Sequence, residues 1–187
     1  MRAVFLDRDG VINRKAPNGF YITSWKEFEF LAGVSEAISL LNRSGFKVIV
    51  ISNQRGIARG MLTQQKLQSI HRKMLASLVG SGARIDAIHY CPHNEGECRC
   101  RKPEIGLFLK AQRDFPEIVF EESFVIGDSW RDIEASKTLG CKGLLIQQRQ
   151  VSAKTEVESL PIDGQASSLL EAVKRYVIPG PSGESSK

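Results

Sequence analysis

The 187-residue chain has no apolar run that approaches the roughly 20 residues needed to cross a bilayer. The apolar stretch at its N-terminus, Ala3–Leu6, is too short for a signal peptide and is followed at once by an aspartate. Cysteine is scarce, with four residues, and a chain of this length can bury a core without disulfides. We therefore expect a cytoplasmic protein that makes no contact with membranes and keeps its thiols reduced.

Long basic runs are also missing, although the net charge is +5. No five or six basic residues follow one another, and arginines do not alternate with aromatic residues, which make up only 7% of the chain. A basic balance can favour nucleic acid, but a basic surface around a phosphate-binding site explains it better. We expect no nucleic-acid partner.

The length suggests one domain, which we place at residues 1–178. Residues 179–187 are rich in Pro, Gly and Ser and are expected to form a disordered tail. Five apolar runs predict strands at residues 3–6, 47–51, 85–90, 123–126 and 143–146. Their apolar residues are continuous rather than alternating, as in strands that are buried on both faces of a sheet.

Segments with helical spacing lie between these runs, at residues 34–41, 67–78, 105–111 and 133–139. Thr63 is a plausible N-cap, Pro103 is expected to begin the third helix, and Gly140 to stop the fourth. A last helix is expected at 167–177. The alternation predicts an α/β fold, doubly wound, with a mainly parallel five-stranded sheet and helices on both faces. Ligands of such sheets bind beyond the carboxyl ends of the strands.

The first predicted strand leads into Asp7-Arg8-Asp9-Gly10. Two carboxylates two residues apart on an extended chain project to the same side, where they repel each other unless a cation or a shared proton intervenes. This arrangement suits Mg²⁺, which prefers oxygen ligands. Taken alone, the motif is equally well explained as a solvated turn after a strand.

Polar residues that can hold phosphoryl oxygens follow other predicted strands. The second strand ends at Ser52 and Asn53, and a loop with Arg55 and Arg59 comes next. Arg101 and Lys102 precede the predicted third helix, so that the Lys102 ammonium would balance the carboxylates. After the fourth strand, Asp128 and Asp132 add two acidic side chains. Each feature alone is explained by a solvated loop or helix start, but four strand tips with such residues are difficult to attribute to chance.

Three of the four cysteines fall within ten residues, in Cys91-Pro92-His93-Asn94-Glu95-Gly96-Glu97-Cys98-Arg99-Cys100. Cys91, His93, Cys98 and Cys100 match a structural zinc site with three thiolates and one imidazole, which leaves no ligand position for water. A disulfide or three unpaired thiols are the alternatives. The expected reducing compartment disfavours the first, and the clustering disfavours the second.

These motifs together resemble the haloacid-dehalogenase superfamily of phosphatases over residues 7 to 143, without a large cap insertion. Cys-Pro-His followed by Cys-x-Cys-Arg-Lys-Pro resembles its zinc-loop branch, which includes heptose-1,7-bisphosphate 7-phosphatases and histidinol-phosphate phosphatases. The stretch Ser52–Gly60 is similar to the heptose enzymes. The short zinc-binding loop, with four residues between His93 and Cys98, is closer in length to the histidinol enzymes.

The resemblance implies a role for each site residue and a small phosphorylated sugar, a heptose bisphosphate, as substrate. Asp7 would be the nucleophile and Asp9 the proton donor and later the general base, while Ser52 and Lys102 would hold the phosphoryl group. Mg²⁺ would be bound by Asp7, Asp9 and Asp128, with Asp132 acting through water or orienting Lys102. Asn53, Arg59 and Arg101 would contact the rest of the substrate. We expect a monomer.

Three other functions remain open on the sequence alone. A histidinol-phosphate phosphatase would use the same chemistry, an enzyme that processes nucleic-acid ends is suggested only by the basic pI, and a non-catalytic zinc-stabilised binding module would not need both Asp7 and Asp9.

Overall fold

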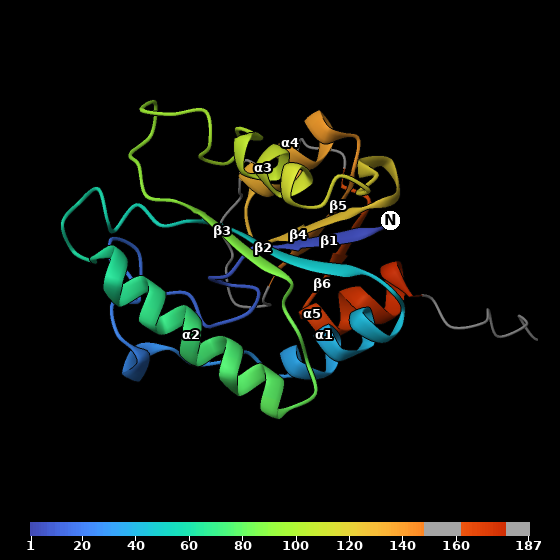
Figure 1. The fold of residues 1–187 in the computed structure, drawn as a ribbon, viewed down its shortest axis with the longest axis horizontal. Helices are drawn as coiled ribbons and strands as arrows, with labels where there is room; N and C mark the ends of the chain where they lie inside the picture. Colours follow the sequence, from blue (N-terminus) through green and yellow to red (C-terminus); the bar gives the residue numbers. More distant parts are fainter. Residues whose placement is uncertain (148–161, 179–187) are drawn as a thin grey trace, which may run out of the picture.

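The computed structural model describes residues 1–147 and 162–178, and one parallel sheet runs through the middle of this part (Figure 1). The expected tail at 179–187 lies outside the described residues. The strands are β1 (Ala3–Leu6), β2 (Lys47–Asn53), β3 (Ala87–Cys91), β4 (Phe124–Gly127), β5 (Lys142–Ile146) and β6 (Gly164–Ala166). Their order in the sheet is β3-β2-β1-β4-β5-β6, and every neighbouring pair is parallel.

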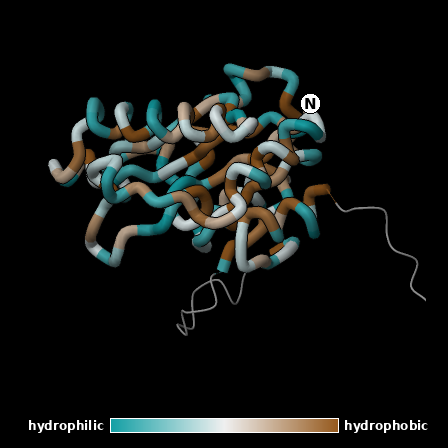
Figure 2. The backbone as a smooth tube through the Cα atoms, turned by 90° about the horizontal axis from the view of Figure 1, so that it is seen from below, coloured by the Kyte–Doolittle hydropathy of each residue, from teal (hydrophilic) through white to brown (hydrophobic). Residues whose placement is uncertain are grey.

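Helices cover both faces of the sheet (Figure 1). On one face lie α1 (Val34–Arg43), α2 (Gln64–Gly80) and α5 (Leu169–Ala172), which continues into a π-helical turn at Val173–Val177; on the other lie α3 (Gly106–Asp114) and α4 (Trp130–Leu139). Hydrophilic and hydrophobic residues alternate along the turns of the helices (Figure 2), which is the pattern of helices with one face against a core. The expected doubly wound α/β architecture is confirmed.

Strand β1 shows why its residues are continuously apolar. Val4 and Leu6 belong to the core between the sheet and α1, α2 and α5, whereas Ala3 and Phe5 belong to the core on the side of α3 and α4. All four side chains are buried, because successive residues of a strand point to opposite faces and both faces are covered.

The strand count and one helix start differ from the prediction. The sheet has six strands, not five, because β6 pairs with β5 although its three residues, Gly164–Ala166, form no apolar run. The third helix begins at Gly106 and not at Pro103. The peptide bond between Lys102 and Pro103 is cis, and α3 begins three residues after Pro103.

Other local predictions are confirmed. The Thr63 side chain accepts a hydrogen bond from the Lys66 amide and caps α2, and Gly140 ends α4 with a φ of +73°. Residues 10–31, between β1 and α1, contain a three-residue 3-10 turn at Trp25–Glu27 and an isolated bridge between Asn13 and Phe30, so no cap domain is inserted there. Within the described ranges, none of the helices combines the length and the apolarity that crossing a membrane requires.

Candidate active site

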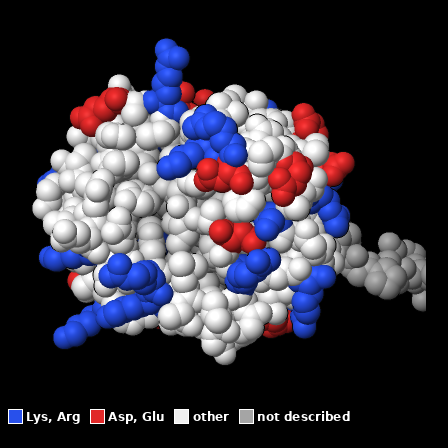
Figure 3. Space-filling view, in the orientation of Figure 1, with Lys and Arg blue, Asp and Glu red and all other residues white. Residues whose placement is uncertain are grey.

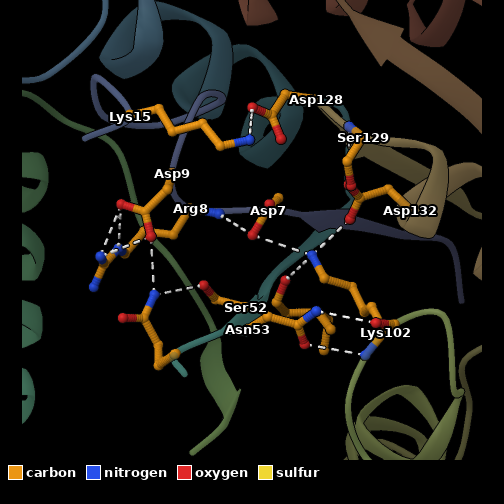
Figure 4. Close-up of polar contacts among 12 residues, drawn as sticks. Asp7, Arg8, Asp9, Lys15, Ser52, Asn53, Lys102, Asp128, Ser129 and Asp132 are labelled. Atoms are coloured by element: carbon orange, nitrogen blue, oxygen red, sulfur yellow. Dashed lines mark hydrogen bonds and ion pairs between the residues drawn. The ribbon is translucent and has the colours of Figure 1, made fainter. Parts of the chain in front are cut away.

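The candidate site lies where three central strands end side by side. Strand β1 pairs with β2 on one side and with β4 on the other, so the residues at their carboxyl ends meet at one edge of the sheet (Figure 4). Asp7 follows β1, Ser52 and Asn53 end β2, and Asp128 follows β4. The Asp7 amide donates to the Ile126 carbonyl at 3.0 Å, which fixes the start of the loop after β1.

Lys102 reaches into this edge from the loop between β3 and α3. The residue is 2% exposed, and its ammonium donates to Asp132 Oδ1 at 2.6 Å and to the Ile51 carbonyl at 2.7 Å, and lies 3.1 Å from Asp7 Oδ1. Burial by itself would lower the pKa of Lys102, but the carboxylates of Asp132 and Asp7 outweigh burial and raise it. Lys102 is therefore a fixed positive charge beside Asp7.

Two polar side chains of β2 organise this charge. Asn53 accepts a hydrogen bond from the Lys102 amide at 3.0 Å and donates to the Lys102 carbonyl at 3.1 Å, so its amide group holds the backbone of that residue. Ser52 is buried and its hydroxyl oxygen accepts from Gln54 Nε2 at 2.8 Å. Because the oxygen of Ser52 is the acceptor in this bond, its own proton can be donated to a ligand.

The carboxylate of Asp9 is held apart from the acidic cluster (Figure 4). Arg8 Nη2 lies 2.8 Å from both of its oxygens, and Asn13 and Gln54 each donate to it at 2.9 Å. Burial by itself would raise the pKa of Asp9, but the charge of Arg8 and these hydrogen bonds lower it below its usual value. Asp9 is therefore ionised and firmly oriented in this arrangement.

Asp7, Asp128 and Asp132 bring carboxylate oxygens within 4.8 Å of one another, close enough to hold one metal ion. The Lys15 ammonium lies 2.7 Å from Asp128 Oδ2, so a cation is already drawn to this cluster. Burial raises the pKa of Asp7 to about 7, although Lys102 opposes the rise. A set of hard oxygen ligands whose charges are costly to bury together fits a Mg²⁺ site.

Two glycines permit this crowding. A Cβ atom at Gly10, whose φ is +91°, would lie 2.2 Å from Asp128 Oδ2, and one at Gly127 would lie 2.1 Å from Asp132 Cγ. Asp132 also accepts from the amide and the hydroxyl of Ser129 and so completes a capping box at the start of α4. The acidic cluster is thus built into the ends of β1 and β4.

The cysteine-rich loop after β3 forms a second group of possible metal ligands. The ligand atoms of Cys91, His93, Cys98 and Cys100 all lie within 4.8 Å of one another. The thiol sulfurs of Cys98 and Cys100 are 3.1 Å apart, and those of Cys91 and Cys98 are 3.5 Å apart, so these thiols are free. His93 Nδ1 faces the thiols of Cys91 and Cys100 at 3.6 and 3.4 Å. The donor set fits a tetrahedral zinc site.

A cavity of about 250 Å³ opens onto the acidic cluster. Residues 15–22 of the excursion after β1, which we call the flap, form one wall, and Asn53, Arg101 and Lys102 line another. Arg59 is exposed and is not among the residues that line the cavity, and the Arg55 guanidinium donates to Asn94. Of the arginines named from the sequence for substrate contacts, the structure brings only Arg101 to the cavity.

Four residues of the site were missed from the sequence: Arg8, Lys15, Gln54 and Arg131. Arg8 and Gln54 lie next to predicted residues, and their proximity to Asp9 depends on how the loops fold back. Lys15 and Arg131 line the cavity from the flap and from α4. From the sequence alone, a basic residue at such a position cannot be distinguished from one that faces solvent.

Charges on the face seen in Figure 3 are mixed. Groups of lysine and arginine side chains are interspersed with aspartate and glutamate, and no continuous basic stripe crosses this face. A long nucleic-acid strand would need such a stripe.

Comparisons with known proteins agree with this geometry. The sequence model of the polynucleotide kinase 3 phosphatase family matches residues 3–143. A D-glycero-β-D-manno-heptose-1,7-bisphosphate 7-phosphatase of Rhodopseudomonas palustris is 40% identical over 157 residues, 80% of this chain and 85% of that protein. A D-glycero-α-D-manno-heptose-1,7-bisphosphate 7-phosphatase of Mycobacterium bovis is 39% identical over 132 residues, 70% and 69% of the two chains.

A solved structure has the same overall shape. The D,D-heptose 1,7-bisphosphate phosphatase from B. bronchiseptica, complexed with magnesium and phosphate, matches with a TM-score of 0.83 at 32% identity, over 95% of this chain and 98% of that one.

Proposed function

Because the chain belongs to the polynucleotide kinase 3 phosphatase family, we propose that it removes the C7 phosphate of D-glycero-D-manno-heptose 1,7-bisphosphate. Family membership confirms the haloacid-dehalogenase type of phosphatase that the motifs indicated, and the chain is accordingly a phosphoric monoester hydrolase. The substrate comes from the relatives, which are named for this bisphosphate and share 39–40% identity with the chain.

One observation carries the proposal: the carboxylate of Asp7 and the ammonium of Lys102 lie 3.1 Å apart and both line a small cavity. A carboxylate that attacks phosphorus needs a positive charge beside it, because negative charge accumulates on the phosphoryl oxygens. Lys102 supplies that charge and cannot move away, since Asp132 and the Ile51 carbonyl hold its other protons.

In the proposed reaction Asp7 attacks the phosphorus in line and becomes an aspartyl phosphate. Ser52 donates its hydroxyl proton to a phosphoryl oxygen, and Lys102 exchanges its 3.1 Å contact with Asp7 for another phosphoryl oxygen. Asp9 protonates the leaving sugar oxygen and then activates the water that hydrolyses the intermediate. Because Arg8 lowers the pKa of Asp9, Asp9 must leave this ion pair and take up a proton from water before the attack, and this is the proton that it gives to the leaving oxygen.

Asp7, Asp128 and the backbone of Asp9 would hold Mg²⁺, which when bound neutralises the charge of the phosphoryl group. Asp132 acts by orienting Lys102. Cys91, His93, Cys98 and Cys100 would hold a structural zinc ion, which fixes the loop that leads into Arg101 and Lys102. A thiolate zinc site also supports a cytoplasmic location, because it requires reduced cysteines. The monomeric state is part of the same proposal.

Removal of a terminal phosphate from nucleic acid is the second candidate, because the family model is named for a polynucleotide phosphatase. The flap at residues 15–22 and the cavity of about 250 Å³ favour a small substrate instead. Histidinol phosphate is a third candidate with the same chemistry, but its amine would be repelled by Arg101 and Lys102.

The test compares kcat/KM for the heptose bisphosphate, histidinol phosphate and an oligonucleotide with a 3′-phosphate, with Asp7→Asn as the inactive control. We expect the bisphosphate to be the best substrate, and NMR to identify heptose 1-phosphate as its product. Equal or better efficiency on either of the other substrates would refute the assignment of the substrate and leave the phosphatase chemistry intact.

A further inference from the structure

Two arginines of the cavity carry buried nitrogen atoms that lack a partner. Nε and Nη1 of Arg101 and Nε of Arg131 are buried and make no hydrogen bond to any described residue. Both side chains line the cavity that holds Asp7 and Lys102. A buried N–H of a charged group is costly when it is not bonded, and an anion in the cavity would supply the missing acceptors for both guanidinium groups.

Arg131 is oriented by its neighbours in the first turn of α4. Its guanidinium carbon lies 4.7 Å from the centre of the Trp130 ring, a cation–π contact that restricts the plane of the guanidinium group. Its charged partner is Glu95 of the cysteine-rich loop, at 3.5 Å. The Glu95 side chain is 63% exposed, and an ion pair of this kind contributes little. A phosphate in the cavity can therefore replace Glu95 at low cost.

The phosphoryl group that reacts does not need Arg131, because the Lys102 ammonium already lies 3.1 Å from Asp7 Oδ1. A guanidinium group binds phosphate through two parallel N–H bonds. We propose that Arg131, together with Arg101, binds the second, unreacted phosphate of a sugar bisphosphate, and that Arg131 is a specificity-determining residue of this chain. This inference rests on the proposed function for its substrate, and it gives Arg131 the role that the sequence suggested for Arg59.

The experiment measures the preference for a second phosphate without requiring the heptose. Hydrolysis of an aryl phosphate is followed in the presence of fructose 1,6-bisphosphate or fructose 6-phosphate as inhibitor, and the ratio of the two inhibition constants is compared among wild type, Arg131→Ala and Arg131→Lys. Arg113→Ala, at an exposed site near the end of α3 that does not line the cavity, is the matched control. The same ratio is then measured as kcat/KM for heptose 1,7-bisphosphate and heptose 7-phosphate.

We expect Arg131→Ala to reduce the preference for the bisphosphate about tenfold, as for the loss of one charge-assisted contact. Arg131→Lys should reduce it less, because the charge remains but the two-pronged geometry is lost, and Arg113→Ala should leave it unchanged. An unchanged preference in Arg131→Ala, or equal weakening of both inhibitors, would overturn the inference. If the heptoses are not hydrolysed while the fructose ratio still falls, the proposed substrate is wrong and the role of Arg131 stands.

Discussion

Asp7 and Asp9 are two residues apart, yet their environments shift their pKa values in opposite directions. Burial raises the pKa of Asp7 to about 7, whereas Arg8, Asn13 and Gln54 lower the pKa of Asp9 despite its burial. The proposed reaction needs Asp7 ionised and Asp9 protonated at the moment of attack. A divalent cation and Lys102 favour the ionised form of Asp7. For Asp9 to be protonated, its contact with Arg8 must be replaced by a hydrogen bond to the leaving oxygen.

The role of Asp7 as nucleophile and the role of Asp9 as proton donor can be separated by comparing substrates with different leaving groups. Asp7→Asn should reduce turnover of every substrate by orders of magnitude, because the attacking charge is lost. Asp9→Asn should reduce turnover of the sugar phosphate far more than that of an activated aryl phosphate, since an aryl oxide leaves without a proton. Rates on both substrates, with circular dichroism as the folding control, test this. Equal losses on both substrates in Asp9→Asn would contradict its role as the acid.

The chain directly after each strand was the most predictable part of the site. Asp7, Ser52 and Asp128 were named because parallel strands end at one edge, and they meet there. Lys102 was expected to be positioned by a helix start at Pro103, but Asn53, Asp132 and the Ile51 carbonyl position it instead. Hydrogen bonds between residues that are 30 to 51 positions apart in sequence leave no periodic signal.

At the scale of elements, the flap brings a cation to the proposed metal ligands. Lys15 pairs with Asp128 at 2.7 Å, and its side chain is 55% exposed. Because this pair must be broken when Mg²⁺ takes the carboxylate, Lys15→Ala should tighten Mg²⁺ binding, by about two- to fivefold as for an exposed ion pair. Calorimetric titration of Mg²⁺ measures this, with Lys110→Ala on α3 as the control. Weaker Mg²⁺ binding in Lys15→Ala would contradict the competition.

The cysteine-rich loop is the second element whose effect on the site can be measured. Cys98→Ser should lower the zinc content from about one ion per chain and raise KM more than it lowers the melting temperature, because the loop carries Arg101 and Lys102. Cys141→Ala, at a buried cysteine outside the cluster, is the matched control and should retain zinc. Freshly purified wild type without zinc in elemental analysis would refute the zinc assignment.

The prediction of strands and helices succeeded where burial requires apolar residues at regular positions in the sequence. It failed where an element is defined only by its hydrogen-bonded pairing with a neighbouring strand. The central strands have both faces covered, so their continuous apolar residues were sufficient. Strand β6 was missed because its three residues include an exposed glutamine, and only its pairing with β5 makes it a strand. Helix α3 starts at Gly106 and not at Pro103, although proline is a frequent first residue of helices.

At the scale of the whole molecule, a chain of contacts connects the site to helix α2 and to strand β3. Arg8, 1% exposed, pairs with Asp9 and places its Nη1 3.4 Å from Nε2 of His71 on α2. The His71 ring in turn packs edge-on against Tyr90 of β3, with 5.8 Å between ring centres. Burial, and next the charge of Arg8, lower the pKa of His71 to about 4.

This contact makes the stability of the fold depend on pH. Between pH 6.5 and 4 the unfolded chain binds a proton at His71 that the folded chain does not, so the free energy of unfolding falls as the pH falls through this window. The loss approaches roughly 3 kcal/mol if the full shift applies. The raised pKa of Asp7 changes the free energy of unfolding in the opposite sense over the same pH range. This contribution of Asp7 is common to wild type and a His71 variant, so it cancels in the difference between the two proteins.

His71→Gln keeps an acceptor for Arg8 and removes the titrating ring. We measure the free energy of unfolding of both proteins by urea denaturation from pH 4 to 7. The value for wild type minus the value for the variant should be smallest at pH 4, because the unfolded wild-type chain takes up a proton at His71 that the folded chain does not bind, and this proton stabilises the unfolded state. A difference between the two proteins that stays constant over this range would show that His71 does not titrate differently in the folded and unfolded states.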